Sequence, residues 1–229
     1  MAAAELTPRA QQTRAAIVEA ALALFRERGY EATTMREIAA RAGVSTGNAY
    51  YYFGSKEELI QEFYATSHAE HLAASRALLG GADGQTGPDD LGARLRVTLR
   101  ALIGVLAPYH EFAAMFYKHA AEPSSPLSPF SQESSPARQA SIAMYRDLVD
   151  GSSARMPKDV RERLPELLWL LQMGVILYWV HDPSPGCART YHLIDVTAPV
   201  AARLVAATRV PMLRSAVGDL AALFDDLRG

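Results

Sequence analysis

A short run of small and polar side chains in the first quarter of the chain has the chemistry needed to contact DNA bases. The run consists of Ser45, Thr46, Gly47 and Asn48. Asparagine can form two hydrogen bonds with the edge of an adenine, and threonine can meet a base or a thymine methyl group. Glycine has no side chain, so it allows a second molecule to approach the backbone closely. These four residues are therefore candidate base contacts.

Residues suited to the DNA backbone flank this run. Tyr50, Tyr51 and Tyr52 are consecutive, so they cannot all face one core and at least one must be exposed. Exposed hydroxyl groups and lysine are common phosphate ligands, and the start of a helix also attracts an anion. No charged residue lies between Val44 and Ser55. The candidate phosphate contacts are therefore Thr34, Tyr51, Tyr52 and Lys56.

The surrounding sequence predicts two short helices joined by a tight turn. Thr34 is a good N-cap, and Glu37 completes a capping box with it. Gly43 can adopt the left-handed conformation that ends a helix, and Ser45 can cap a second helix that begins at once. Apolar residues on the first helix recur at the spacing of one helical face, namely Met35, Ile38, Ala39 and Ala42. This pattern is typical of a helix-turn-helix; the alternative is an ordinary helical hairpin.

A longer helix is predicted before this pair, from about Arg9 to Arg28, with Gly29 as its stop. Its apolar residues would cover the helix-turn-helix and complete a three-helix domain. Arg9 and Arg14 lie near its start, where they either touch a phosphate or are simply solvated. The apolar face consists of Ile17, Ala20, Ala21, Leu24 and Phe25.

Residues 43–59 resemble the DNA-binding signature of TetR-family transcriptional regulators. The resemblance extends over about the first 65 residues, including the preceding helix and the segment 29–34. Two positions depart from the family pattern: Ala49 stands where a larger aliphatic residue is usual, and Asn48 where a small Thr, Ser or Ala is common. The resemblance implies that a helix starting at Ser55 joins the DNA-binding domain to a regulatory domain and swings when an effector binds.

The rest of the chain also predicts helices and no strand. The expected fold class is all-α, with an N-terminal three-helix, helix-turn-helix DNA-binding domain at residues 1–54. A larger C-terminal helical domain for ligand binding and dimerisation follows at residues 55–229. The expected C-terminal helices span about residues 55–79, 91–106, 109–121, 136–150, 165–181, 191–208 and 211–227.

An aromatic stripe on the helix 109–121 is either plain core or one wall of a cavity for a small, largely apolar effector. The apolar candidates for ligand binding are Phe112, Met115, Phe116 and Trp169, and the polar candidates are His110, His119 and Gln172. The segment 122–137 contains four prolines and six serines, which predicts an extended loop able to gate such a pocket. Leu127 and Phe130 are its only large apolar residues and are expected to hold it against the domain.

A two-fold homodimer is expected, because one small motif makes few base contacts and a dimer doubles them on a palindromic site. The helix 165–181 is apolar on more faces than one core can absorb, and aromatic residues and Met are enriched at such interfaces. The candidate interface residues are Trp169, Met173, Gly174, Ile176, Tyr178, Ala201, Leu204, Val205 and Thr208.

Composition limits the remaining possibilities. With 49% hydrophobic residues, 21% charged residues and a net charge of −2, the chain has no bulk basicity, so DNA affinity must come from the placement of charge. The apolar run at residues 167–180 is too short to span a bilayer, and no membrane partner is expected. Cys187 is the only cysteine; it is either a redox sensor or a passive loop residue, and its isolation fits a reducing cytoplasm. His68 and His71 have the spacing of a metal pair but are expected to be polar residues on an exposed helix.

No phosphate-binding loop, nucleophile elbow or paired metal motif is present in the sequence, and no metal, cofactor or catalytic residue is expected. The sequence therefore favours a cytoplasmic bacterial regulator that is not an enzyme. Its expected partners are double-stranded operator DNA, a small-molecule effector and a second copy of itself. We expect a repressor, although an activator of the same fold shares every feature. An all-helical enzyme and an architectural DNA-binding protein are two rival function classes.

Overall fold

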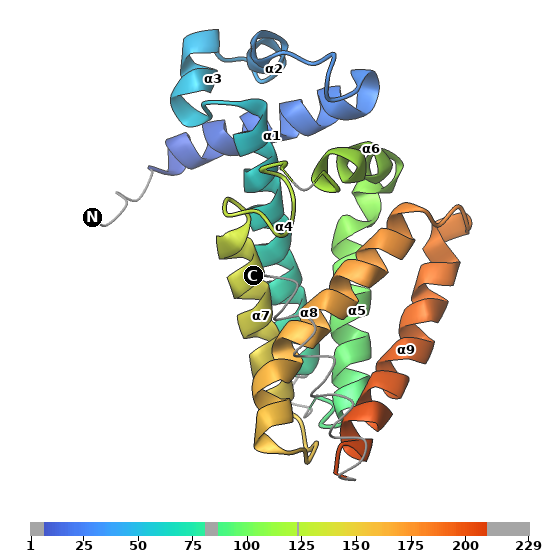
Figure 1. The fold of residues 1–229 in the computed structure, drawn as a ribbon. Coiled ribbons are helices and arrows are strands. Elements are labelled where there is room, and N and C mark those ends of the chain that lie inside the picture. The colour runs from blue at the N-terminus through green and yellow to red at the C-terminus, as the bar shows by residue number, and fades with distance from the viewer. Residues whose placement is uncertain (1–6, 81–86, 123, 210–229) are drawn as a thin grey trace. The chain divides into compact units, whose positions relative to one another are not determined.

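The computed structural model describes residues 7–80, 87–122 and 124–209, except for five side chains on helix α6. All α-helices and 3-10 helices in these ranges follow one another without a strand (Figure 1), which confirms the predicted all-α fold class. In chain order they are α1 (Pro8–Arg28), α2 (Met35–Arg41), α3 (Thr46–Tyr52), α4 (Lys56–Leu79), α5 (Leu91–Leu106), η2 (Ala107–Tyr109), α6 (His110–Ala120), α7 (Ser135–Asp150), α8 (Lys158–Val180), η3 (Pro185–Cys187) and α9 (Ala188–Ala207). The helix expected at residues 211–227 lies outside the described residues.

The chain forms two compact units. The N-terminal unit consists of Met1–Ser67 and Tyr109–Ser135, and the C-terminal unit of His68–Pro108 and Pro136–Gly229. Helix α4 begins in the N-terminal unit and ends in the C-terminal unit. The N-terminal unit thus includes the start of α4 and a segment from the middle of the chain, in addition to the predicted domain at residues 1–54.

The core of the N-terminal unit follows from the apolar spacing of its helices. The side chain of Ile17 on α1, that of Ile38 on α2 and that of Ala49 on α3 are each 0% exposed. Phe53 and Ile60 close this core from the end of α3 and the start of α4. Burial of the apolar faces therefore fixes all three helices, and α2 and α3, at seven residues each, would be marginal alone.

The proline- and serine-rich segment is folded into turns rather than extended, contrary to our expectation. The backbone N–H groups of Ser125, Ser128 and Ser131 each donate to the carbonyl oxygen three residues earlier. The hydroxyl oxygens of Ser125 and Ser128 accept from the N–H groups two residues later, at 3.2 and 3.3 Å. Proline suits the second position of such turns and serine the first, so the repeated Ser-Pro pairs stabilise compact turns.

The two large apolar residues of this segment differ in burial. Leu127 is 2% exposed and belongs to the same core cluster as Ile17, as expected of a residue that holds the segment in place. Phe130 is 59% exposed, so more than half of its surface faces solvent. The Nε2 atom of Gln61 on α4 donates to the Pro126 carbonyl oxygen at 2.7 Å and to the Ser134 hydroxyl at 3.3 Å.

In the C-terminal unit, α5 and α9 lie side by side and α8 packs on both (Figure 1). Helix α8 begins at Lys158, seven residues before the expected start, and carries Pro165 in its interior. Proline removes a backbone donor and usually interrupts a helix, but Pro165 is buried, so packing contributes to holding it there. Pro199 likewise lies inside α9.

The histidines on α4 are not on an exposed surface, contrary to our expectation. His71 is 1% exposed, and its Nε2 atom lies 2.9 Å from the Thr98 carbonyl oxygen. The Nδ1 atom of half-buried His68 lies 3.2 Å from the Ser141 hydroxyl oxygen. Within the described ranges, no group of three or more metal-binding side chains is assembled.

The single cysteine lies inside the protein. Cys187 is buried, and its burial raises the pKa of the thiol, so the reactive thiolate form is disfavoured. Of the passive and redox-sensing roles, this environment favours the passive one.

The apolar run near the middle of α8 belongs to a helix of the C-terminal unit. Among the described helices, none combines the length and apolarity needed to cross a bilayer.

Candidate nucleic-acid interface

The turn between α2 and α3 is built by the local signals expected from the sequence. The Thr34 hydroxyl accepts from the Glu37 backbone N–H at 3.3 Å, and the Glu37 carboxylate accepts from the Thr34 N–H at 2.9 Å. At the other end of α2, Gly43 has a φ of 70°, which a residue without a Cβ adopts freely. The Val44 N–H then donates to the Ala39 carbonyl oxygen at 3.0 Å. These bonds fix where α3 begins and hence which residues it presents.

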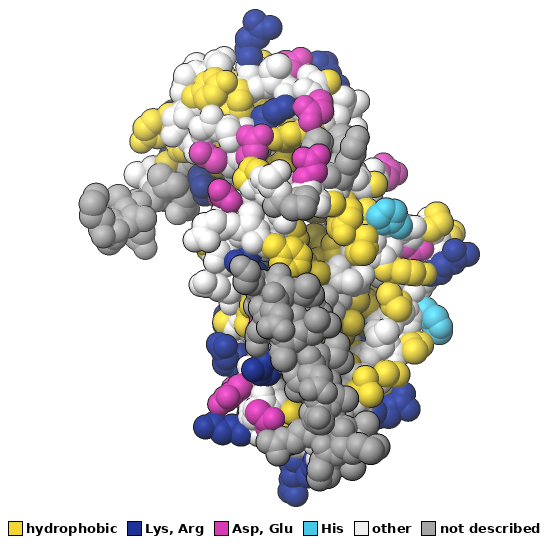
Figure 2. Space-filling view, in the orientation of Figure 1, with side chains coloured by type: hydrophobic (Ala, Val, Ile, Leu, Met, Phe, Trp, Pro, Cys, Tyr) yellow, Lys and Arg dark blue, Asp and Glu magenta, His cyan; other side chains and the backbone are white. Residues whose placement is uncertain are grey.

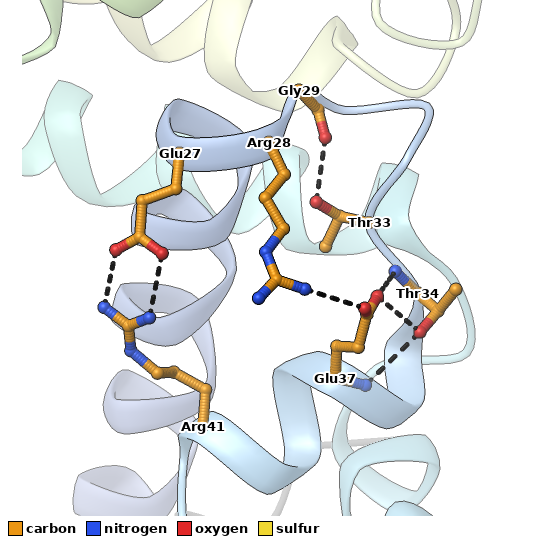
Figure 3. Close-up of polar contacts among 7 residues, drawn as sticks. All are labelled: Glu27, Arg28, Gly29, Thr33, Thr34, Glu37 and Arg41. Carbon is orange, nitrogen blue, oxygen red and sulfur yellow. Dashed lines mark hydrogen bonds and ion pairs between the residues drawn. The ribbon is translucent and has the colours of Figure 1, made fainter.

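Two ion pairs clamp α2 to the end of α1 (Figure 3). Arg41 donates through both terminal nitrogens to the two carboxylate oxygens of Glu27, at 3.0 and 2.7 Å. Arg28 donates to Glu37 at 3.0 Å. Hydrogen bonds from the Thr34 side chain and backbone lower the pKa of the Glu37 carboxyl, with Arg28 adding to the effect. The guanidinium groups of Arg28 and Arg41 are therefore committed to the protein itself.

The predicted base contacts gather at the start of α3, and most of them are open to solvent. Ser45, Gly47 and Asn48 are exposed, and Thr46 is half-buried. The Ser45 hydroxyl accepts from the Asn48 backbone N–H at 3.1 Å, which caps the helix. Within the described part of the chain, the side-chain amide of Asn48 makes no hydrogen bond, which leaves it available to an external partner.

Neither the backbone conformation nor the packing within the described residues requires glycine at position 47. Its φ is not positive, and a Cβ atom built on it would have no neighbour within 4 Å. Glycine inside a helix is about 1 kcal/mol less favourable than alanine. A residue that costs stability and serves no packing role on an exposed surface is suited to the close approach of another molecule.

The tyrosines at the end of α3 divide as their spacing predicts. Tyr51 is 79% exposed and Tyr50 is 52% exposed, whereas Tyr52 is half-buried. The rings of Tyr51 and Tyr52 pack edge to face with centroids 5.1 Å apart. Tyr50, which was not among the predicted phosphate contacts, thus offers an exposed hydroxyl on the same helix.

Two cations near this surface have partners within the N-terminal unit. The Lys56 ammonium donates to the Tyr30 carbonyl oxygen at 2.7 Å and lies 4.3 Å from the centroid of the Tyr30 ring. Arg14 pairs with Glu62 and also covers the Phe53 ring, so it is neither free for phosphate nor simply solvated. The predicted phosphate contact of Lys56 would have to share the ammonium with Tyr30.

Other arginines are uncommitted. Arg9 and Arg36 are exposed, and neither side chain forms an ion pair within the described ranges. Arg36 lies in the first turn of α2, and it was not among the predicted contacts. The sequence shows where the arginines are but does not predict which of them form ion pairs, because the pairing depends on how α1 packs on α2.

A groove of about 680 Å³ joins the start of α1 to the start of α3. It brings residues about 40 positions apart in sequence to one surface of the N-terminal unit. Its polar lining includes Arg9, Gln12 and Thr13 from α1 together with Ser45, Asn48 and Tyr52. The groove therefore places a cation and several hydrogen-bonding side chains beside the candidate base contacts.

The predicted ligand-binding residues are distributed over both units. Trp169 and Gln172 on α8 are 2% and 5% exposed, and Gln172 Oε1 accepts from the Tyr145 hydroxyl at 2.8 Å. His110, at the start of α6, belongs to the N-terminal unit and is half-buried. The side chains of Phe112, Met115, Phe116 and His119 lie outside the described residues.

Six of the nine predicted dimer residues reach the surface of α8 and α9, and we call the exposed parts of these two helices the α8–α9 surface. Figure 2 shows hydrophobic side chains gathered over α9. Tyr178 is 42% exposed and Leu204 63%; Gly174 is exposed, and Met173, Ile176 and Ala201 are half-exposed. Val205, Thr208 and Trp169 are buried within this chain, so they offer little area to a partner. The exposed residues that the prediction missed are Leu177, Val196 and Val200.

The sequence matches two family models. One, described as "Tetracyclin repressor-like, C-terminal domain", matches residues 94–223, and the other, described as "Bacterial regulatory proteins, tetR family", matches residues 17–63. The HTH-type transcriptional regulator TtgR of Pseudomonas putida is 44% identical over 68 residues, which are 30% of this chain and 32% of TtgR. The matched stretch thus spans about a third of the length of the first curated relatives.

Solved structures share the fold over most of the chain. A TetR transcriptional regulator from Nitrosomonas europaea matches with a TM-score of 0.60 at 19% identity, over 82% of this chain and 97% of that one. Thermus thermophilus FadR, a TetR-family transcriptional repressor solved in complex with lauroyl-CoA, matches with a TM-score of 0.57 at 24% identity, over 79% and 90% of the two chains. At these identities the likeness shows the fold alone.

Proposed function

Since the chain belongs to the TetR family of bacterial transcriptional regulators, we propose that it is a homodimeric repressor that binds a palindromic operator and is released by a small, largely apolar effector. The family consists of DNA-binding regulators rather than enzymes. A regulator of this kind acts on chromosomal DNA, so we place it in the cytoplasm.

The observation that carries the proposal is the open, glycine-containing start of α3. Asn48 reads an adenine, and Ser45 and Thr46 meet neighbouring base edges while Gly47 lets the backbone come close. Phosphates on either side are held by hydroxyl groups and by cations. The proposed phosphate contacts are Thr34, Tyr51, Tyr52 and Lys56 as predicted from sequence, with Arg9, Arg36 and Tyr50 added because of their exposure.

Dimerisation through the α8–α9 surface is supported by exposed apolar residues at helical spacing. Val196, Val200 and Leu204 follow one another every four residues on α9 and are 39–63% exposed. A Cβ atom built on Gly174 of α8 would meet no side chain or neighbouring helix within 4 Å among the described residues, so a second helix can approach there. A two-fold dimer brings two α3 helices to half-sites about 34–36 Å apart.

Effector control would use α4, which is continuous between the two units. The effector must have a higher affinity for the dimer conformation that cannot bind DNA than for the conformation that binds it. An effector with equal affinity for both conformations shifts no equilibrium, however tightly it binds. The complex of T. thermophilus FadR with lauroyl-CoA supports an effector with a long apolar part. Of the residues predicted to bind the effector, we retain Trp169 and Gln172, which both lie in the C-terminal unit. The roles of His110, Phe112, Met115, Phe116 and His119 stay predictions from the sequence.

Footprinting on the intergenic DNA beside the gene tests the DNA-binding part of the proposal. We expect two symmetric protected half-sites, and transcription that rises when the gene is deleted. Sedimentation at micromolar concentration tests the dimer. Absence of sequence-specific protection, or a monomer, would contradict the corresponding part, and transcription that falls on deletion would indicate an activator.

A further inference from the structure

A group of buried polar side chains lies inside the C-terminal unit, where α4, α5 and α7 meet. We call it the polar cluster, and it consists of His68, His71, Ser75, Thr98 and Ser141. The α4 members are spaced at i, i+3 and i+7, which places them on one face of the helix. His71, Ser75 and Thr98 are each at most 1% exposed. This is a polar strip on helix faces that would ordinarily be apolar.

Two contacts inside the polar cluster involve its histidines, and one of them fixes the position of a proton. The His71 Nε2 atom lies 2.9 Å from the Thr98 carbonyl oxygen, so this nitrogen must carry a proton and donate. The His68 Nδ1 atom lies 3.2 Å from the Ser141 hydroxyl, which can either donate or accept. The other nitrogen of His68 can therefore serve an external group as a donor or as an acceptor.

Three atoms of the polar cluster have no hydrogen-bond partner among the residues that the structure describes. They are His68 Nε2, Ser75 Oγ and Thr98 Oγ1, and all three atoms are shielded from solvent. Buried polar atoms in folded proteins almost always have a partner. In the N-terminal unit, by comparison, the buried hydroxyl of Thr33 donates to the Gly29 carbonyl oxygen, and that of Ser134 accepts from Gln61. A bound molecule with a polar group could supply the hydrogen bonds that these three atoms lack.

The polar cluster carries no formal charge near neutral pH. Burial lowers the pKa of His68, and it lowers the pKa of His71 to about 4 despite the opposing hydrogen bond to Thr98. Of the three arginines near Thr98 along α5, Arg94 donates to the carbonyl oxygens of Leu148 and Pro88, Arg100 pairs with Asp195, and Arg96 is exposed to solvent. An ionised carboxylate or phosphate would thus be buried here without a cation, which is strongly unfavourable.

We propose that the polar cluster binds the polar end of the effector, and that the effector is an uncharged, mostly apolar molecule bearing a carbonyl or hydroxyl oxygen. Ser75 and Thr98 supply hydroxyl donors, and His68 supplies a group that adapts to either partner. Leu95 and Leu102, buried on the same face of α5 as Thr98, suit an apolar remainder. This inference rests on the proposed effector-controlled function and narrows the chemical class of the effector.

Isothermal titration of the full-length protein with 2-undecanone tests the assignment, with undecanoate at pH 8 as the charged probe of equal chain length. We expect the ketone to bind at least about tenfold more tightly than the carboxylate, because burial of the carboxylate charge without a cation is strongly unfavourable. Ser75→Ala and Thr98→Val should each weaken ketone binding by about tenfold or more. Thr197→Val is the matched control, because the Thr197 hydroxyl already donates to the Leu193 carbonyl oxygen within α9.

The melting temperature of the ligand-free variants separates a binding role from a structural one. Because the two hydroxyls lack partners within the described residues, Ser75→Ala and Thr98→Val should keep or raise the melting temperature. A lowered melting temperature with unchanged ketone affinity would overturn the inference, as would failure of the ketone to bind or tighter binding of undecanoate. If these failures occur while the DNA footprint is normal, only the role of the polar cluster in effector binding is rejected. If the footprint itself is absent, the proposed function is rejected.

Discussion

The two compact units differ in how they treat buried polar groups. In the N-terminal unit the buried hydroxyls of Thr33, Ser128 and Ser134 have partners within the chain. In the C-terminal unit Ser75 and Thr98 bury hydroxyls that have none among the described residues. The N-terminal unit therefore satisfies these interior groups and presents its free hydrogen-bonding groups outward, at the start of α3. The C-terminal unit instead buries the hydroxyls of Ser75 and Thr98 without a hydrogen-bond partner among the described residues.

This difference shows how one chain can serve two kinds of ligand. A duplex is too large to enter a protein core, so its contacts must lie on a rigid surface, and ion pairs such as Arg41–Glu27 hold that surface in place. In our proposal a small apolar effector is recognised inside the C-terminal unit, where a few polar atoms orient it. Substitutions in each unit can therefore break one function and spare the other.

Removing Leu127 should have the largest effect on stability. Leu127→Ala deletes a fully buried side chain from the core of the N-terminal unit, and such substitutions cost about 2–5 kcal/mol. Phe130→Ala is the matched control in the same segment, because Phe130 is 59% exposed and exposed substitutions usually change stability by about 0.5 kcal/mol or less. Urea unfolding followed by circular dichroism measures both. Equal losses would show that the segment does not complete this core.

The buried histidine should make the C-terminal unit sensitive to acid. The pKa of His71 is lowered by burial to about 4, so between about pH 6.5 and 4 the unfolded chain binds a proton that the folded chain does not. Stability should therefore fall as pH falls through this window, by up to about 3 kcal/mol at pH 4. His71→Gln keeps a donor for the Thr98 carbonyl oxygen but cannot titrate. Parallel stability curves for wild type and His71→Gln would contradict the burial of a neutral imidazole.

Asn48→Ala should weaken binding to the footprinted operator by about 1–3 kcal/mol and relax discrimination at one base pair. Stability should change little, because Asn48 is exposed. Fluorescence anisotropy on the operator and on single-base variants of it measures both effects. An unaltered preference at every base pair would remove Asn48 from the proposed base contacts.

Arg36→Ala should reduce affinity for all DNA sequences alike. Removing one phosphate contact reduces the slope of log affinity against log salt by about 0.9. Arg41→Ala is the comparison, since the Arg41 guanidinium is paired with Glu27 and its removal should leave that slope unchanged. Anisotropy titrations at several salt concentrations measure the slopes. The opposite ranking of the two variants would mean that the ion pair opens on DNA.

Much of the fold follows from local signals in the sequence. The capping box at Thr34 and the glycine turn at Gly43 are predicted by residue type alone and appear as expected. The sequence predicts that α8 starts at Pro165, because proline usually begins a helix rather than occupying its interior. Tertiary packing overrides that preference, and no local signal reveals it.

The candidate sites were harder to predict where they depend on contacts between distant segments. Sequence alone could not distinguish committed Arg41 from uncommitted Arg36, because only the packing of α1 on α2 pairs Arg41 with Glu27. Leu127 and Phe130 have similar local surroundings but opposite exposure. The sequence around His71 is typical of an exposed helix. Its burial could not be predicted, because it depends on α5, whose Thr98 lies 27 residues away in sequence.

Gly47→Ala is the most direct test of whether the start of α3 faces DNA. Beyond its chain neighbours and the backbone of α3, no atom of the described residues lies within 4 Å of the added methyl group. Alanine in place of a helical glycine should stabilise the N-terminal unit by about 0.5–1 kcal/mol. Operator affinity, measured by fluorescence anisotropy on the same preparation, should nevertheless fall because the methyl group meets the duplex. A more stable protein that binds the operator as tightly as wild type would contradict the proposed interface.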